Sequence, residues 1–202
     1  MVWVKICGLQ DVETALFAVQ AGADALGFVF APSRRQVMPS QIRPVLEVLP
    51  TSVMKIGVFV DAPIGQLQEI AHSCRLDAVQ LHGSEPPAYC RLIGRQVIKA
   101  FRVGEEGLLE MISNYDGDTI LLDTYVPGYA GGTGKCFDWR LVERLKGTKR
   151  IILSGGLNPE NVREAIRIAQ PFGVDVSSGV EINGRKDREK ISKFIKKAKK
   201  VW

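Results

Sequence analysis

The first residues that could do chemistry stand in the stretch VKICG, residues 4–8, where Cys7 ends a strand-like apolar run and Gly8 follows it. A thiolate can act as a nucleophile or a general base, whereas a cysteine among apolar strand residues is more often an inert core thiol. Cys74 and Cys90 lie on helical patterns and fit the inert interpretation. Cys7 differs because a thiol at a strand end can face solvent, and Gly8 leaves room beside it.

A second candidate is Asp123, which ends the apolar stretch TILLD. It is followed by the long glycine-rich segment YVPGYAGGTGKCFDW, residues 125–139. Long loops in compact domains are typically lids or binding loops. Such a lid would shield the carboxyl group from water, raise its pKa and keep it able to donate a proton. The competing interpretation is an aspartate that only caps a turn.

Two glycine-bearing segments, SGG at 154–156 and SSG at 177–179, also follow apolar runs. Glycine allows backbone N–H groups to approach an anion closely, and a helix N-terminus adds a favourable dipole. Glycine also simply turns a chain, so one segment alone is weak support. Together they predict a phosphate site formed by Gly155, Gly156, Ser178 and Gly179.

The elements that must position these residues follow from the hydrophobic pattern, which alternates between strand-like and helical periods without a break. Strands are predicted at 2–7, 25–30, 53–60, 77–82, 96–101, 119–123, 150–154 and 173–178. Helices are predicted near 11–21, 39–49, 64–74, 86–93 and 106–115, from 138, from 159 and over 187–202. Buried strands alternating with amphipathic helices indicate a parallel sheet, and eight units predict one (β/α)8 barrel domain over residues 1–202.

An aspartate near every second predicted strand supports this fold, because alternating layers are typical of a closed barrel. These residues are Asp24, Asp77, Asp118 and Asp175, each interpreted as preceding its strand. In such barrels the chemistry lies where strands end and the following loops begin. Cys7, Asp123 and both glycine segments occupy such ends and are therefore expected at one mouth.

Composition limits the remaining possibilities. The chain has 202 residues, 46% hydrophobic and 24% charged, with a formal net charge of +5. Much of the excess positive charge lies in the last predicted helix, whose lysine face is interpreted as solvated rather than as a nucleic-acid site. No apolar run reaches the roughly 18 residues that span a membrane, and the scattered cysteines argue against disulfides and zinc. A cytoplasmic protein is expected.

Several motifs together resemble the phosphoribosylanthranilate isomerases of tryptophan biosynthesis. These are KICG, GFVFAPSRR, GVFVD, VQLHG, LLD followed by GGTGKCFDW, LSGGLNPENV and GVDVSSGVE. They occur in order from residue 5 to about residue 187 and so cover nearly the whole chain. The resemblance implies a (β/α)8 barrel without a cofactor that performs an Amadori rearrangement on a phosphosugar, as a monomer or homodimer.

The resemblance also implies roles. Cys7 would be the general base that removes the C2 proton of the opened sugar, and Asp123 the general acid that protonates the ring oxygen. Arg35 would hold the anthranilate carboxylate, and His82 would line the pocket. Gly155, Gly156, Ser178 and Gly179 would hold the phosphate.

One segment departs from the family pattern. The family's loop usually reads S-P-R, whereas this chain has Ser33, Arg34 and Arg35. Arg35 is preferred as the carboxylate ligand by its spacing from Phe30 and Ser33, although Arg34 is the alternative. Two other functions remain open: a related isomerase of histidine biosynthesis or of both pathways, and a catalytically silent phosphosugar-binding protein. The resemblance to the histidine-pathway isomerases would imply a pair of catalytic aspartates on strands one and five. This chain has Cys7 at the strand-one position.

Overall fold

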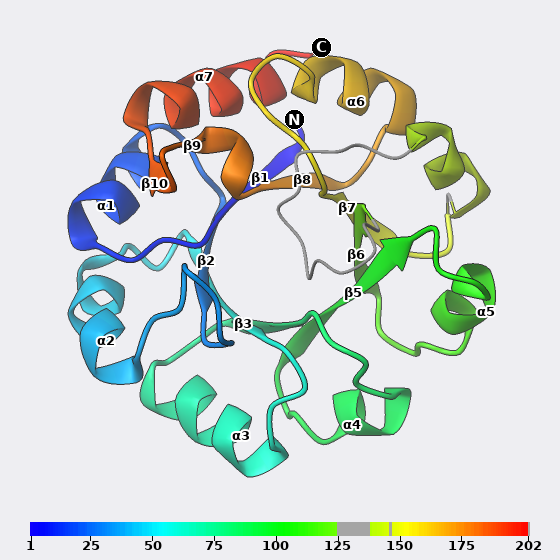
Figure 1. The fold of residues 1–202 in the computed structure, drawn as a ribbon, viewed down its shortest axis with the longest axis horizontal. Helices are drawn as coiled ribbons and strands as arrows, with labels where there is room; N and C mark the ends of the chain where they lie inside the picture. Colours follow the sequence, from blue (N-terminus) through cyan, green and yellow to red (C-terminus); the bar gives the residue numbers. More distant parts are fainter. Residues whose placement is uncertain (125–137, 146, 202) are drawn as a thin grey trace.

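The computed structural model describes residues 1–124, 138–145 and 147–201. Its centre is a closed barrel of eight strands, each paired in parallel with its neighbours, with β8 returning to β1 (Figure 1). The strands are β1 (Trp3–Cys7), β2 (Ala25–Val29), β3 (Met54–Phe59), β4 (Ala78–Leu81), β5 (Gln96–Val103), β6 (Thr119–Thr124), β7 (Arg150–Leu153) and β8 (Gly173–Val176). The predicted barrel is confirmed, with every strand at its expected place.

The helices form a ring around the strands (Figure 1). They are α1 (Val12–Gln20), α2 (Pro39–Val48), α3 (Ile64–Ser73), α4 (Pro87–Arg91), α5 (Leu108–Ser113), the 3₁₀ helix η1 (Trp139–Leu145), α6 (Val162–Ala169) and α7 (Arg188–Lys199). The helix predicted from residue 138 is thus a 3₁₀ helix. Its buried residues Val142 and Leu145 are three apart, which matches the three residues per turn of that helix.

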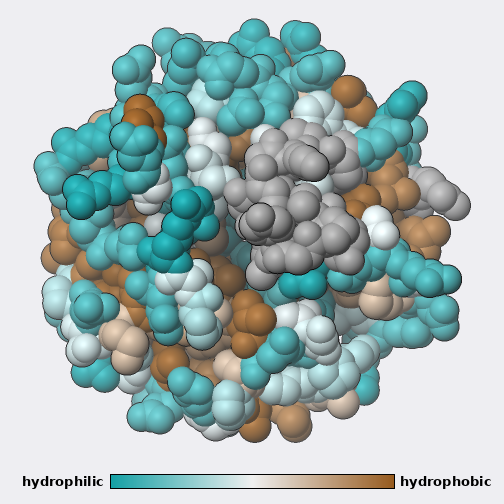
Figure 2. Space-filling model, viewed as in Figure 1, coloured by the Kyte–Doolittle hydropathy of each residue, from teal (hydrophilic) through white to brown (hydrophobic). Residues whose placement is uncertain are grey.

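The main hydrophobic core lies between the barrel and the helices, where apolar helix faces pack on the outside of the strands. A second, smaller cluster fills the barrel interior with Ala25, Ile56, Ala78, Ile98, Ala100, Leu121 and Ile152. Hydrophilic side chains predominate around the periphery of the face in Figure 2, as expected when apolar helix faces turn inward. Within the described residues, no helix has the length and apolar character required to cross a membrane.

The recurring aspartates form two different kinds of contact, a hydrogen bond with the backbone or a buried ion pair. Asp24 and Asp77 precede β2 and β4, and each accepts a hydrogen bond of 2.7 Å from a backbone N–H, of Val4 and Lys55 respectively. Asp175 instead lies within β8, is buried, and forms an ion pair of 3.0 Å with Lys5. The predicted repeat is therefore wrong at its last member, because Asp175 points into the barrel and pairs with a buried charge.

A short structure after β8 was not predicted. The 3₁₀ turn η2 (Ser178–Val180) leads into a hairpin of β9 (Glu181–Ile182) and β10 (Arg185–Lys186). Asn183 and Gly184 form its turn with φ of 50° and 77°. An Asn-Gly pair is the usual signal for such a turn, so the sequence did contain the information. The hairpin brings Glu181 and Lys186 to the barrel mouth.

Candidate active site

One cavity of about 190 Å³ lies at the carboxyl ends of the strands. All eight predicted site residues line it: Cys7, Arg35, His82, Asp123, Gly155, Gly156, Ser178 and Gly179. They come from the ends of six strands or the loops that follow them, namely β1, β2, β4, β6, β7 and β8. The closure of the barrel therefore brings residues from the whole chain to one site.

Cys7 ends β1 and is buried at the floor of this cavity. Burial raises the pKa of the Cys7 thiol, the positive charges of Lys5 and Lys186 lower it, and Asp175 raises it, leaving the pKa above its ordinary value. A thiol with a raised pKa forms a strong base once it is ionised. Gly8, with φ of 79°, makes room for Arg35, because a Cβ at residue 8 would lie 2.5 Å from Cδ of that arginine.

The raised pKa of Cys7 gives a direct prediction. Only the thiolate reacts with iodoacetamide, so the alkylation rate of Cys7 should keep rising with pH up to and beyond 9.0, the ordinary value for this thiol. Peptide mass spectrometry after timed alkylation measures this rate at each pH. A rate that is already constant near about pH 7 would contradict the described environment of the thiol.

Asp123 lies in β6, and both its oxygens accept hydrogen bonds. Nε2 of His82 lies 3.2 Å from Oδ2, and the backbone N–H of Thr124 donates to Oδ1 at 2.8 Å. A Cβ at Gly155 would overlap the backbone of Thr124, so the glycine clears space for this end of β6. The lid predicted from the loop at 125–139 lies almost entirely outside the described residues and stays a prediction.

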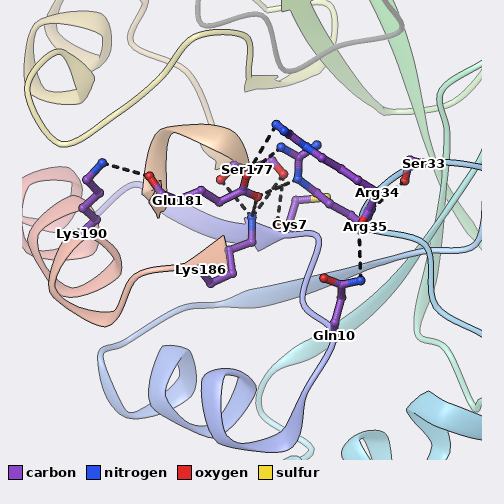
Figure 3. A network of polar contacts seen from close by, with 9 residues as sticks. All are labelled: Cys7, Gln10, Ser33, Arg34, Arg35, Ser177, Glu181, Lys186 and Lys190. Atoms are coloured by element: carbon purple, nitrogen blue, oxygen red, sulfur yellow. Dashed lines mark hydrogen bonds and ion pairs between the residues drawn. The ribbon is translucent and has the colours of Figure 1, made fainter. Parts of the chain in front are cut away.

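The two arginines of the loop after β2 are placed differently (Figure 3). Arg35 has a side chain only 14% exposed and makes a two-point contact with Glu181, with Nε to Oε1 at 2.7 Å and Nη2 to Oε2 at 2.9 Å. Arg34 is 63% exposed, with its Nη2 3.8 Å from Oε2 of the same carboxylate. Of the two, Arg35 is therefore the fixed cation at the cavity wall.

Glu181 and Lys186 belong to the same network but were not singled out in the sequence. Lys186 Nζ lies 2.7 Å from Oε1 of Glu181 and donates to the Ser177 carbonyl oxygen at 2.9 Å, as Figure 3 shows. Burial would raise the pKa of Glu181, but hydrogen bonds from Arg35 and Lys186 hold it below its usual range. The only sequence signal was the glutamate that closes GVDVSSGVE.

The loops after β7 and β8 touch each other. Gly155 and Gly156 have positive φ, 80° and 67°, which side chains rarely adopt. A Cβ at Gly179 would overlap the carbonyl oxygen of Leu157. Glycine at these positions thus allows a close approach of the two loops.

Comparison with known proteins gives the family. A model of the family described as N-(5'phosphoribosyl)anthranilate (PRA) isomerase matches residues 4–197. The chain belongs to the PRA isomerase family. It is 52% identical over 203 residues to the N-(5'-phosphoribosyl)anthranilate isomerase of Desulforudis audaxviator, with all of both chains covered.

Solved structures of PRA isomerases agree with this assignment. The crystal structure of the enzyme from Thermotoga maritima superimposes with a TM-score of 0.92 at 49% identity and covers 98% of this chain and 99% of its own. Another PRA isomerase structure, in complex with reduced 1-(o-carboxyphenylamino)-1-deoxyribulose 5-phosphate, gives a TM-score of 0.88 at 47% identity, with 98% and 99% covered. The chain is accordingly an isomerase of tryptophan biosynthesis, as the motifs predicted.

Membership of the PRA isomerase family also sets aside the histidine-pathway alternative as the family of this chain. Among the described residues, no group of three or more His, Cys, Asp or Glu side chains is arranged to hold a metal ion. Among the described residues, the ionisable side chains that line the cavity are Cys7, Arg35, His82, Asp123 and Asp175.

Proposed function

We propose that this chain catalyses the Amadori rearrangement of N-(5'-phosphoribosyl)anthranilate to 1-(2-carboxyphenylamino)-1-deoxyribulose 5-phosphate, with Cys7 as general base and Asp123 as general acid. The observation that carries the residue roles is their placement. Both residues line one cavity at the strand ends, together with the two glycine loops and Arg35. A base, an acid and an anion site in one cavity are the parts that this proton-transfer reaction needs.

The reaction needs one proton in and one proton out. Asp123 donates a proton to the furanose ring oxygen, and the C1–O bond breaks to give a Schiff base with the anthranilate nitrogen. Cys7, as thiolate, removes the proton from C2, and the electron pair moves to form the enol that becomes the ketone of the product. The substrate thus gains one proton and loses one, which is the balance of an isomerisation. At the end Cys7 is protonated and Asp123 is ionised.

Turnover itself is the direct test. Freshly prepared N-(5'-phosphoribosyl)anthranilate is added to the protein, and the loss of anthranilate-type fluorescence is followed. Rapid loss supports catalysis, whereas a folded protein that binds the substrate without consuming it would support the silent phosphosugar-binding alternative.

Arg35 is proposed to hold the anthranilate carboxylate, since its described contacts use Nε and Nη2 and leave Nη1 for the ligand. Arg35→Lys keeps the charge but loses the planar two-point contact with Glu181, so the cation loses its fixed position. We expect KM to rise about tenfold or more, the worth of one charge-assisted hydrogen bond. The matched control Arg34→Lys changes an exposed side chain and should change KM little. Steady-state kinetics measure both, and the reverse order would assign the carboxylate to Arg34.

Inorganic phosphate is expected to compete with the substrate, because it can occupy the loops at 155–156 and 178–179 without the rest of the molecule. Ser178→Ala should weaken this inhibition only mildly, since backbone N–H groups remain. Gly156→Val should weaken it strongly, because φ of 67° is strained for a β-branched residue. Inhibition constants for phosphate measure both effects. Non-competitive inhibition, or none, would place the anion elsewhere.

The setting of the enzyme is also inferred. Scattered cysteines without a pairing pattern fit a reducing compartment, so we place the enzyme in the cytoplasm. We also infer that it is a single-domain monomer or homodimer and that it binds neither nucleic acid nor membrane. One related structure concerns monomers generated from the dimeric PRA isomerase of Thermotoga maritima, at 46% identity and a TM-score of 0.88. Sedimentation measurements would distinguish the two assembly states.

A further inference from the structure

A row of hydrogen-bonded side chains runs beneath the cavity from one side of the barrel to the other. Lys5 on β1 donates from Nζ to Oε1 of Gln80 on β4 at 2.8 Å. Nε2 of Gln80 lies 2.9 Å from Nδ1 of His82, and Nε2 of His82 lies 3.2 Å from Oδ2 of Asp123. The row therefore starts beside Cys7, the proposed base, and ends at Asp123, the proposed acid.

Lys5 is fully buried, which is unusual for a lysine and needs a reason. Burial alone lowers the pKa of Lys5, but the charges of Asp175 and Cys7 and hydrogen bonds with both raise it above its ordinary value. These contacts therefore favour the charged ammonium form of Lys5. Its contact with Asp175, at 3.0 Å, balances that charge inside the barrel.

Lys5 and Cys7 are two residues apart on β1, so both point to the same side of the strand. Both approach Gly27 of the neighbouring strand: a Cβ there would lie 2.7 Å from Sγ of Cys7 and 3.0 Å from Cε of Lys5. The ammonium therefore adjoins the thiol, and both side chains are buried. There a positive charge acts more strongly on an ionisable neighbour than it does in water.

The direction of each hydrogen bond in the row is fixed by Lys5. An ammonium has donors and no acceptor, so the atom of Gln80 that faces it must be the carbonyl oxygen. The amide nitrogen of Gln80 then faces Nδ1 of His82 and donates to it. His82 must consequently accept at Nδ1 and carry its proton at Nε2, from which it donates to Asp123.

A protonated His82 does not fit this arrangement. Its Nδ1–H would face the amide hydrogens of Gln80, donor against donor, and a flipped Gln80 would turn those hydrogens toward the Lys5 ammonium. A neutral His82 keeps its Nε2–H as a donor to Oδ2 of Asp123, so the imidazole does not itself take up the proton that the general acid must deliver to the substrate.

We propose that Lys5 is a positioning residue for both halves of the reaction: its ammonium stabilises the Cys7 thiolate directly and, through Gln80, holds His82 as the neutral Nε2–H form beside Asp123. This inference rests on the proposed roles of Cys7 and Asp123. The other charged groups around Cys7 are Lys186 from β10, Arg35 from the loop after β2 and Asp175 from β8. Lys186 and Arg35 also favour the thiolate, whereas Asp175 opposes it.

The state of His82 can be measured without any assay of activity. The chain has only two histidines, His72 and His82, so the ring nitrogen signals of ¹⁵N-labelled protein are assigned with a single His72→Asn variant. At about pH 7 we expect His82 as the Nε2–H tautomer. Gln80→Leu should release it to a mixture of tautomers or to the imidazolium. A wild-type His82 that is protonated at Nδ1, alone or in the imidazolium, would overturn this half of the proposal.

The state of Cys7 is tested with Lys5→Met, which keeps the length of the side chain and removes its charge. We expect the midpoint of Cys7 alkylation against pH to rise by about one unit, which makes the rate below the midpoint about tenfold slower. A changed maximal rate with an unchanged midpoint would indicate altered access and would overturn this half. Cys90, on α4, is alkylated in the same sample and serves as the internal reference.

Lys99→Met is the matched control. Lys99 is also buried and paired, with Glu85 at 3.0 Å, but it lies on β5, opposite β1 in the barrel. Its loss should leave the Cys7 midpoint unchanged, so an equal shift in both variants would mean a general effect of losing a buried ion pair and would overturn the proposal. If Lys5→Met does not fold, the tautomer of His82 in the wild-type protein still tests the proposal. The Nδ1–H tautomer would contradict the row of hydrogen bonds from Lys5 to Asp123.

These results separate this inference from the proposed function. An inactive Cys7→Ser enzyme with the wrong His82 tautomer and an unshifted Lys5→Met midpoint would keep the function and overturn the role of Lys5. A fully active Cys7→Ser enzyme would overturn the proposed role of Cys7 as general base, while the two measurements on His82 and Cys7 remained valid.

Discussion

Replacement of Cys7 by serine is expected to lower kcat by about 10²–10⁴-fold, the usual contribution of general acid–base catalysis. Serine matches the shape of the side chain, and its hydroxyl can still contact the Lys5 ammonium, so folding should be little affected. The hydroxyl does not ionise in the accessible pH range, whereas the thiol does. Stopped-flow or steady-state fluorescence with N-(5'-phosphoribosyl)anthranilate measures the loss, and the thermal unfolding midpoint reports on the fold.

Cys74→Ser provides the control for that loss. Cys74 is buried and, like Cys7, has a pKa raised by burial, but it stands at the end of α3 away from the cavity. Its replacement should leave kcat unchanged. A Cys7→Ser enzyme with near-normal kcat would show that another group removes the C2 proton.

Asp123→Asn is expected to reduce kcat by a similar factor of about 10²–10⁴, because an amide cannot donate its proton to the ring oxygen as a carboxylic acid does. The structure adds a second effect. His82 and the Thr124 N–H donate to different oxygens of Asp123, and asparagine has only one. One donor must then face an NH₂ group, which costs about 1–3 kcal/mol of stability. The variant should therefore unfold at a lower temperature as well.

The two effects separate in experiment. Activity is measured well below the unfolding temperature of the variant, and phosphate inhibition shows whether the anion loops are intact. Asp118→Asn makes the same change just before the start of β6, at the opposite end of the barrel, where the side chain is exposed. It should leave kcat unchanged. Normal kcat in Asp123→Asn would remove Asp123 as the acid.

The fold was predictable because every unit of the chain carries its own local signal. Apolar runs with period two or none and helical runs with period 3.6 alternate eight times. The side chains of Asp11 and Asp187 cap α1 and α7 by accepting backbone hydrogen bonds. The mouth of the barrel was predictable for the same reason. Residues that follow a parallel strand must lie at one end of the sheet, whatever the details of packing.

The prediction was wrong or silent where the outcome depends on contacts between distant segments. Asp175 resembled the strand-preceding aspartates in sequence, but its partner Lys5 lies 170 residues away and meets it only when β8 closes on β1. Glu181 and Lys186 gained their roles in the same way, since the hairpin folds back over the end of β1. Arg34 and Arg35 are neighbours of one chemical type, and their different burial and contacts with Glu181 are seen only in the structure.

The sequence by itself determined the barrel, the family and eight of the residues at its mouth, because strand and helix periods and the order of motifs are properties of short segments. The tertiary structure alone decided which charges are buried, which groups they pair with and which way the hydrogen bonds run. The physical reason is that the cost of a buried charge depends on every neighbour within a few ångströms. Here those neighbours are gathered from four strands, so that Lys5, an ordinary lysine in the sequence, lies at the centre of the site.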